Sequence, residues 1–372
     1  MKIKAITMYE IRIPFQEPFR ISSGVARNTN SIIVKVVTEE GYTGYGEAAP
    51  MDGNFYSQTT PAQCWEMLQV ECPKLIGQKF SQPEEFAKLV LASPFARAAI
   101  ETALWDCLAQ ERKLPLYGLL GGERRKIDCG LAVGIYDTID ELLAVIARYL
   151  ERGYGRVKIK IQPGWDLEPV REVRRAFGDI PLFVDANAAY SLADLDVFQK
   201  LDEFDLMMYE QPFAAGALEE HAELSQKVKT PVCLDEGVAD LADAKKVVEL
   251  GSAKIVNIKL QRVGGFGPAL EIQRFCYKEG IDLWCGSMPE LGVGQGAGLH
   301  LATLPGFVYP SDLGPSLRFF KDDLLNPFLE MDRRGQIEVP TGFGLGLEIN
   351  QEKIERLANA KACWHKSTIK AS

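Results

Sequence analysis

From about residue 130, the sequence alternates short apolar runs with segments in which apolar residues have helical spacing. The runs are Leu131–Tyr136, Arg156–Ile161, Pro181–Asn187, Leu206–Gln211, Pro231–Glu236, Lys254–Leu260, Ile281–Gly286 and Phe307–Asp312. Near-continuous apolar strands that alternate with helices are typical of a parallel sheet. Eight such units in one stretch predict a closed, TIM-like (β/α) barrel rather than an open doubly wound sheet.

The first 125 or so residues have a different pattern. Strands are expected at Lys2–Ile13, Ser31–Thr38 and Thr43–Ala48, followed by helices that include Ala96–Glu111. Strands followed by helices indicate a separate α+β domain. We therefore expect an α/β protein with a capping domain at 1–125 and a barrel carrying the active site at 126–320. A segment at 321–372, strand- and turn-like near Gly335–Ile349, would return to the cap.

Composition excludes several classes of function. Lys and Arg number 42 against 51 Asp and Glu, a net charge of −9, which argues against a nucleic-acid partner. The N-terminus lacks the features of a signal peptide, and no apolar run approaches the roughly 18 residues of a membrane span. Eight cysteines without CxxC pairs indicate reduced thiols. We expect a cytoplasmic protein without a membrane partner, and a homo-oligomer is compatible with the sequence.

Ionisable residues recur at the predicted strand ends, where a barrel of this kind has its active site. The second strand carries Lys158 and Lys160, which alternation places on one face. The ends of the next four strands carry Asp185, Glu210, Asp235 and Lys259. Counted from Lys160, each of these residues follows the previous one after 25, 25, 25 and 24 positions. No GxGxxG or P-loop motif follows the first strand.

Two interpretations of the carboxylates compete. Structural ion pairs around the barrel rim are the simpler one, but burying several charges is costly unless they are compensated or bind a metal. Asp185, Glu210 and Asp235 offer three hard oxygen donors from adjacent strands. That set favours Mg²⁺, with Mn²⁺ as the alternative ion.

The lysines on either side of the carboxylates suggest acid–base chemistry. Lys160 and Lys259 would face each other across the barrel mouth, with Lys158 as a second positive charge beside Lys160. A lysine near other cations has a lowered pKa and can act as a base near neutral pH. The predicted reaction is abstraction of the weakly acidic proton next to a substrate carboxylate, with metal and ammonium stabilising the enediolate.

These residues together resemble the muconate-lactonizing subgroup of the enolase superfamily, over essentially the whole chain. The matching motifs are Lys158-x-Lys160, Asp185-x-Asn187, Glu210-Gln-Pro, Asp235-Glu236 and Lys259. The resemblance implies Mg²⁺ on the three carboxylates, an acid/base pair of Lys160 and Lys259, and supporting roles for Asn187 and Glu236. His221, His300 and His365 are not at strand ends, so the His-based mandelate racemase subgroup is not expected.

Within the subgroup, the chain is similar to o-succinylbenzoate synthases and N-succinylamino acid racemases. The similarity rests on stretches such as Gly46-Glu47-Ala48, Phe55-Tyr56-Ser57, Lys259 to Gly265, Trp284 to Gly292 and Pro310 to Leu313. It implies substrate-binding roles for Arg20, Ser23, Met51, Tyr56, Ser287, Met288, Glu290 and Asp312. Departures at Gly286-Ser287, Pro289 and Gly294-Gln295-Gly296 leave specificity open.

The leading hypothesis is syn-dehydration of 2-succinyl-6-hydroxy-2,4-cyclohexadiene-1-carboxylate to o-succinylbenzoate, a step of menaquinone synthesis. The alternative is racemisation of an N-succinyl or other N-acylamino acid. Another epimerase or cycloisomerase activity of the subgroup ranks after it. A catalytically silent barrel used for binding is the alternative of a different class. The partner in either enzymatic reaction is a small carboxylate substrate.

Overall fold

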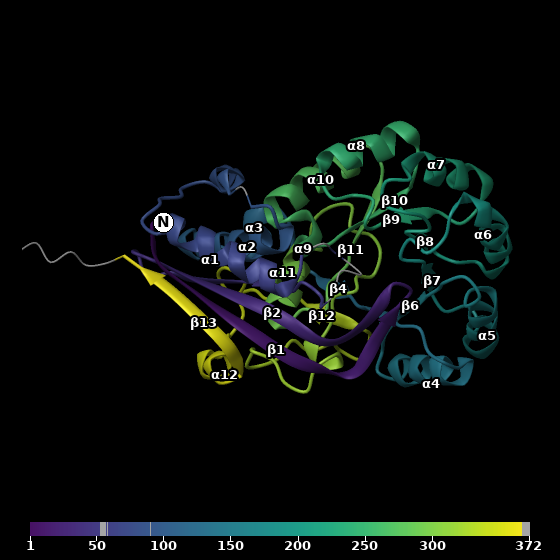
Figure 1. Cartoon of the computed structure of the whole chain (residues 1–372), viewed down its shortest axis with the longest axis horizontal. Helices are drawn as coiled ribbons and strands as arrows, with labels where there is room; N and C mark the ends of the chain where they lie inside the picture. Colours follow the sequence, from purple (N-terminus) through teal and green to yellow (C-terminus); the bar gives the residue numbers. More distant parts are fainter. Residues whose placement is uncertain (53–56, 58, 90, 367–372) are drawn as a thin grey trace, which may run out of the picture.

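The computed structural model describes residues 1–52, 57, 59–89 and 91–366. A barrel with helices on its outside lies beside a domain built on an antiparallel sheet (Figure 1). In the described part of the chain, no helix is both long and apolar enough to cross a bilayer. The eight cysteines are free thiols, and all but Cys363 are buried.

Seven parallel strands form the barrel wall in sequence order. They are β5 (Gly130–Val133), β6 (Arg156–Lys160), β7 (Leu182–Asp185), β8 (Tyr209–Glu210), β9 (Val232–Leu234), β10 (Ile255–Ile258) and β11 (Asp282–Cys285). The predicted eighth strand, 307–312, makes only single bridges, Phe307 with Leu283 of β11 and Ser311 with Cys129 before β5. Pro310 lies between these bridges and has no N–H to donate to a ladder. The segment nevertheless closes the barrel.

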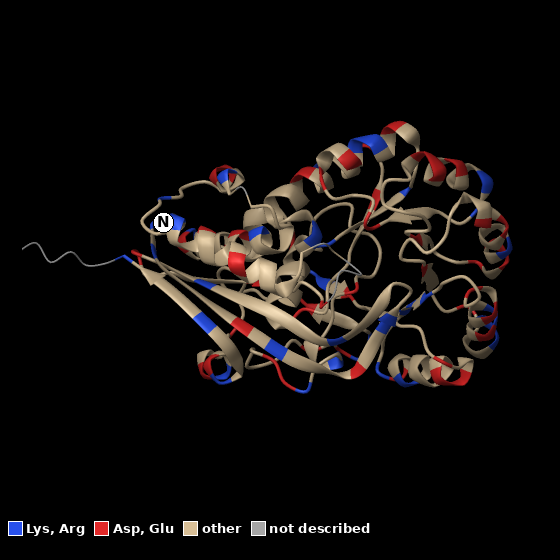
Figure 2. Ribbon diagram, viewed as in Figure 1, with Lys and Arg blue, Asp and Glu red and all other residues tan. Residues whose placement is uncertain are grey.

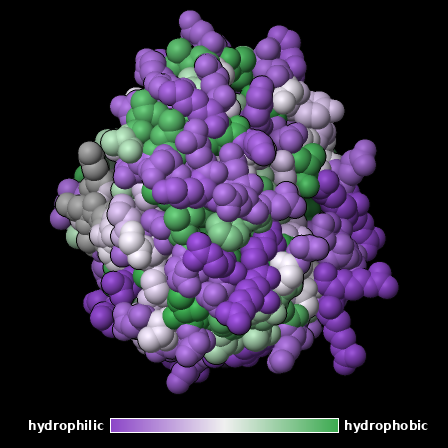
Figure 3. Space-filling model, turned by 90° about the vertical axis from the view of Figure 1, so that its right-hand side faces the viewer, coloured by the Kyte–Doolittle hydropathy of each residue, from purple (hydrophilic) through white to green (hydrophobic). Residues whose placement is uncertain are grey.

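Helices follow most strands and pack around the barrel. They are α4 (Ile139–Leu150), α5 (Leu167–Phe177), α6 (Leu195–Leu201), α7 (Leu218–Lys227), α8 (Leu241–Leu250), α9 (Leu260–Val263), α10 (Phe266–Lys278) and α11 (Gly292–Leu301). Short 3-10 helices are η1 (Pro83–Lys88), η2 (Leu192–Asp194), η3 (Asp202–Phe204) and η4 (Ser316–Arg318). Charged residues follow the outward faces of α4 to α8 (Figure 2), and the surface on that side is largely hydrophilic (Figure 3).

The N-terminal part is a sheet covered by helices. Its strands are β1 (Ile3–Ile21), β2 (Gly24–Thr38) and β3 (Thr43–Ala48), and its helices are α1 (Pro61–Leu75), α2 (Pro94–Glu111) and α3 (Leu116–Leu120). The β1–β2 hairpin extends well past the predicted strands, so that its turn reaches the barrel mouth (Figure 1). Helix α2 lies so close to β3 that a Cβ added at Gly46 would be 1.9 Å from the Ala99 carbonyl oxygen.

The C-terminal segment contacts both parts of the molecule. Strand β12 (Gln336–Glu338) pairs with β4 (Lys126–Asp128) beside the barrel. After α12 (Gln351–Leu357), strand β13 (Ala358–His365) adds to the outer edge of β1, in a sheet of order β13-β1-β2-β3. The expected strand- and turn-like region near 335–349 therefore contains β12, whereas β13 lies beyond it.

Candidate active site

The barrel strands bring the predicted ionisable residues to one mouth. In the sheet register Lys160 lies opposite Asp185 and Asp185 opposite Glu210, so their side chains leave adjacent strands at the same level. Asp235 and Lys259 follow the last residues of β9 and β10. All five side chains are buried. Across β8 and β9 the register shifts, because Glu210 lies opposite Cys233, two residues before Asp235.

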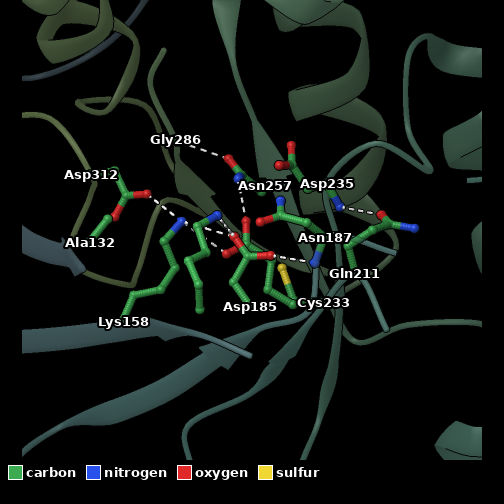
Figure 4. A network of polar contacts seen from close by, with 12 residues as sticks. Ala132, Lys158, Asp185, Asn187, Gln211, Cys233, Asp235, Asn257, Gly286 and Asp312 are labelled. Atoms are coloured by element: carbon green, nitrogen blue, oxygen red, sulfur yellow. Dashed lines mark hydrogen bonds and ion pairs between the residues drawn. The ribbon is translucent and has the colours of Figure 1, made fainter. Parts of the chain in front are cut away.

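The lysines form ion pairs with the carboxylates (Figure 4). Lys158 Nζ lies 3.4 Å from Asp185, 3.0 Å from Glu210 and 2.5 Å from Asp312. Lys160 pairs with Asp185 as well. Lys158 is therefore bonded to three carboxylates, and the role that this geometry gives it is to hold their side chains in place.

Asp235 is held on the other side of the mouth. Lys259 Nζ lies 2.6 Å from one of its carboxylate oxygens, and Arg262, one helical turn later, binds the other oxygen. The Gln211 side-chain oxygen also accepts the Asp235 backbone N–H at 3.0 Å. Lys259 thus enters the mouth from β10 while Lys160 enters from β6, with β7 to β9 between them in the sheet.

Burial and charge shift the pKa values of these groups in opposite directions. Burial and the negative charge of Asp185 raise the pKa of Glu210 to about 8. Although burial alone would raise the pKa of Asp185, Lys160 and Lys158 hold it below its ordinary value. Burial and the charge of Asp235 raise the pKa of Glu236 to about 7. The carboxylates are therefore close enough to repel one another, a state that a divalent cation would relieve.

The donor set has the chemistry of a Mg²⁺ site, with carboxylate oxygens from three neighbouring strands. Two further oxygens nearby, Asn187 Oδ1 and Glu236 Oε2, are buried without a hydrogen-bond partner in the structure. Such orphaned acceptors fit a cation or a substrate donor. In the described residues, however, no three His, Cys, Asp or Glu side chains are grouped as a metal cage. The carboxylates are bonded to the lysines instead. The three carboxylates therefore have the right chemistry for Mg²⁺, whereas in this structure they form ion pairs with the lysines.

Asn257 connects the carboxylates to the next strand. Its side chain donates to Glu210 at 2.8 Å and accepts from the Gly286 N–H at 2.8 Å (Figure 4). A Cβ at Gly286 would lie 2.4 Å from the Asn257 oxygen. Glycine at 286, just before the departure at Ser287, is therefore needed for this approach of β11 to β10.

A cavity of about 560 Å³, including its open mouth, lies above these groups. Its lining combines polar groups from the barrel with apolar side chains from the cap and from the C-terminal side: Phe19, Ile21, Met51, Ala132, Lys158, Lys160, Asn187, Lys259, Ser287, Met288, Pro289, Asp312, Arg318 and Phe319. Both candidate acid/base lysines line the same cavity.

The predicted substrate-binding residues divide into two groups. Met51, Ser287, Met288 and Asp312 line the cavity. Arg20 and Ser23 do not: Arg20 is exposed and pairs with Asp137 at 2.9 Å, and Ser23 is also exposed. Glu290 is buried and bonds to Gln295 at 3.2 Å outside the cavity lining, and Tyr56 lies outside the described residues.

Sequence reasoning missed Arg156, Asn257, Arg262 and Arg318. Arg156 forms a buried pair with Asp312 at 2.8 Å. It alternates with Lys158 and Lys160, and Asn257 alternates with Lys259, so the strand period that found the lysines could have found both. Arg318 follows an irregular segment, where no periodicity marks it.

Two family models match the chain. "Mandelate racemase / muconate lactonizing enzyme, N-terminal domain" covers residues 3–121, and "Enolase C-terminal domain-like" covers residues 141–353. Curated relatives include an o-succinylbenzoate synthase of Geobacillus kaustophilus, 39% identical over 99% of both chains. An N-succinylamino acid racemase of Thermus thermophilus is 36% identical over 96% of this chain and 97% of its own.

Solved structures agree with these matches. A member of the enolase superfamily from Listeria innocua has a TM-score of 0.92 and 32% identity, covering 98% of this chain and 99% of its own. An N-succinyl Arg/Lys racemase from Bacillus cereus has a TM-score of 0.90 and 29% identity, covering 98% and 100%. The shared fold, the two domain matches and full-length identity above 30% lead to one conclusion: the chain belongs to the enolase superfamily.

Proposed function

We propose that this protein is an o-succinylbenzoate synthase, a hydro-lyase that dehydrates 2-succinyl-6-hydroxy-2,4-cyclohexadiene-1-carboxylate in menaquinone synthesis. The observation that carries the proposal is the presence of Lys160 and Lys259 in one cavity, above three buried carboxylates. The full-length relatives with that activity in their names support the choice of substrate. The setting would be the cytoplasm, and the partner a small carboxylate substrate.

Lys160 acts as the base in this proposal. It removes the proton next to the substrate carboxylate, the bond from carbon to hydroxyl breaks on the same face, and the proton returns to the departing hydroxide as water. In this proposal Lys259 keeps its proton, with Asp235 2.6 Å away, and it faces the developing enediolate. Lys158 keeps Asp185 and Glu210 in position.

Asp185, Glu210 and Asp235 are the residues that would hold Mg²⁺, or Mn²⁺ in its place, supported by Asn187 and Glu236. The ion would supply positive charge to the substrate carboxylate and so make the neighbouring proton more acidic. A structural neighbour, the dipeptide epimerase of Cytophaga hutchinsonii at 26% identity, is described as complexed with Mg.

The deciding experiment is turnover of the cyclohexadiene carboxylate by the purified protein with Mg²⁺, followed by loss of its ultraviolet absorption. Rapid turnover that EDTA stops and added Mg²⁺ restores is the expected result. A folded protein that binds Mg²⁺ but does not consume this compound would contradict the synthase proposal.

Racemisation of N-succinyl or other N-acylamino acids is the second candidate. Both lysines line the cavity, as a 1,1-proton transfer between two faces requires, and racemases are among the full-length relatives. Loss of optical rotation of N-succinyl amino acids, with deuterium uptake at the α carbon, would measure it. A catalytically silent barrel is not favoured by this complete set of ionisable groups; absence of Mg²⁺ binding in calorimetry would support it.

A further inference from the structure

Arg318, the last residue of η4, lies in a wall between two hollows. One is the cavity that holds Lys160 and Lys259. The other, about 910 Å³ including its mouth, lies between the β1–β2 hairpin, β5 and the end of α4. Phe19, Ala132, Arg318 and Phe319 line both hollows. A ligand attached to the reaction centre could therefore extend past Arg318.

The charge of Arg318 has no acidic partner among the described residues. The other cationic side chains that line the reaction cavity are paired: Lys158, Lys160 and Lys259 each contact a carboxylate within 3.4 Å. Arg318 instead donates to the Ala132 carbonyl oxygen. A half-buried cation beside an apolar wall is costly unless something compensates its charge, and a ligand can do so.

Aromatic rings hold the guanidinium in place. Its central carbon lies 4.8 Å from the centroid of Phe319, 5.4 Å from that of Tyr149 and 5.8 Å from that of Tyr154. One N–H is used by Ala132, which leaves other donors of the planar fork for a second acceptor. Such a preorganised fork matches the two oxygens of a carboxylate.

The adjacent hollow is also positively charged. Arg148 and Arg152 stack on the same Tyr149 ring, 5.2 and 5.1 Å from its centroid. The acidic residue in that lining, Glu17, is bonded to Arg148 at 3.0 Å. An anion that reaches this end of the site would therefore meet an excess of positive charge.

We infer that Arg318 binds a second carboxylate of the substrate, remote from the carboxylate at the reaction centre, and that it selects dicarboxylic substrates. The inference deepens the proposed function and rests on it for the position of the reacting end. The acyl chain would run along Phe19 and Phe319, with its terminal carboxylate on the guanidinium. Arg318 would be a specificity residue and would take no part in proton transfer.

The test compares ligands that differ in the remote carboxylate. Binding of o-succinylbenzoate and of 2-butanoylbenzoate, which has a methyl group in place of that carboxylate, is measured by calorimetry with Mg²⁺ present. We expect the wild type to prefer the diacid by about 10- to 100-fold, as for a charged hydrogen-bonded pair. In Arg318→Met the preference should fall to about threefold or less, while affinity for the monoacid stays the same.

Two variants keep the result interpretable. Arg318→Lys retains charge without the fork and should keep part of the preference. Arg152→Met removes a stacked arginine that does not line the reaction cavity, and should leave the preference within about threefold of the wild type because solvent screens its charge. Unchanged thermal unfolding of Arg318→Met, together with its monoacid affinity, shows that it has folded.

A wild-type protein that binds both ligands equally, or an Arg318→Met variant that keeps the preference, would overturn the inference. Equal weakening of both ligands in that variant would also overturn it, because it indicates a structural role. The same pair of measurements with N-succinyl- and N-butanoylphenylalanine covers a racemase. Failure of the cyclohexadiene turnover therefore refutes the synthase proposal without deciding the role of Arg318.

Discussion

The two sides of the cavity are built on different principles. The barrel side consists of buried charges at strand ends, where each lysine is paired with a carboxylate. The sheet register aligns Lys160, Asp185 and Glu210. The other side comes from the β1–β2 hairpin and the segment after the barrel, and it supplies Phe19, Ile21, Phe319 and the cation Arg318. The difference suggests that the barrel side carries proton transfer, while the other side decides which substrate reaches it.

The sharpest way to separate the two sides is Lys160→Met. Removing the proposed general base from the barrel side should lower kcat for dehydration by about 10³- to 10⁴-fold. Product affinity in calorimetry should change little, since the remaining contacts persist. Thermal unfolding and Mg²⁺ binding are the controls. A variant that retains more than a tenth of wild-type kcat would contradict the role given to Lys160.

Lys259→Arg distinguishes the two reactions on the same side of the cavity. Arginine keeps the positive charge but does not give up its proton, so dehydration should fall by only about 10-fold. Racemisation, which needs a proton carrier on each face, should fall by about 10³-fold or more. The measurement is kcat/KM for both substrates in one preparation. Equal losses would show that Lys259 transfers a proton in dehydration too.

Sequence periodicity was enough for the barrel side because a parallel strand repeats the same geometry in every unit. Seven of eight predicted strands are observed as strands, and the regular spacing from Lys160 to Lys259 corresponds to one group per strand end. The structure also placed Lys158 among three carboxylates, a contact that alternation alone could not specify.

The other side was harder to predict for physical reasons. Pro14 and Pro18 lie in the distal part of β1, where proline argues against a strand, and the register shifts between Pro14 and Phe19. β13 is a half-exposed edge strand with weak apolar alternation, and its pairing with β1 joins the two ends of the described chain. Arg318 ends η4, a 3-10 helix of 3 residues that is too short to show a periodic pattern, so its place depends on tertiary contacts.

Gly46→Ala tests whether the cap depends on close packing rather than on charge. The new Cβ would meet the Ala99 carbonyl oxygen at 1.9 Å, and a backbone atom cannot easily move away. We expect a loss of about 3 kcal/mol in the free energy of unfolding, the size of an overpacked core. Gly155→Ala is the matched control, because nothing lies within 4 Å of its Cβ. Equal effects of the two changes in urea unfolding would refute the packing argument.

His300 connects the barrel helix α11 to the N-terminal domain and to the C-terminal segment, and it should make this contact sensitive to pH. Its ring accepts the Tyr117 N–H at 3.2 Å and bonds to the Leu345 carbonyl oxygen at 2.9 Å, joining α11 to α3 and the C-terminal segment. Burial lowers its pKa to about 4 from an ordinary 6.5. The folded protein therefore holds a neutral ring, while the unfolded chain takes up a proton below pH 6.5.

Stability from this group should be complete above pH 6.5 and decline as the pH falls from there through about 4. The decline is on the order of 2 kcal/mol, below the roughly 3 kcal/mol that the full shift would give. Urea unfolding of the wild type and His300→Gln at several pH values between 4 and 7 measures it. His300→Gln should be less stable at pH 7, and its difference from the wild type should narrow as the pH falls. If the difference in unfolding free energy stayed constant across this range, His300 would contribute through packing and hydrogen bonds alone. The contact of α11 with α3 and the C-terminal segment would then not depend on the charge of His300.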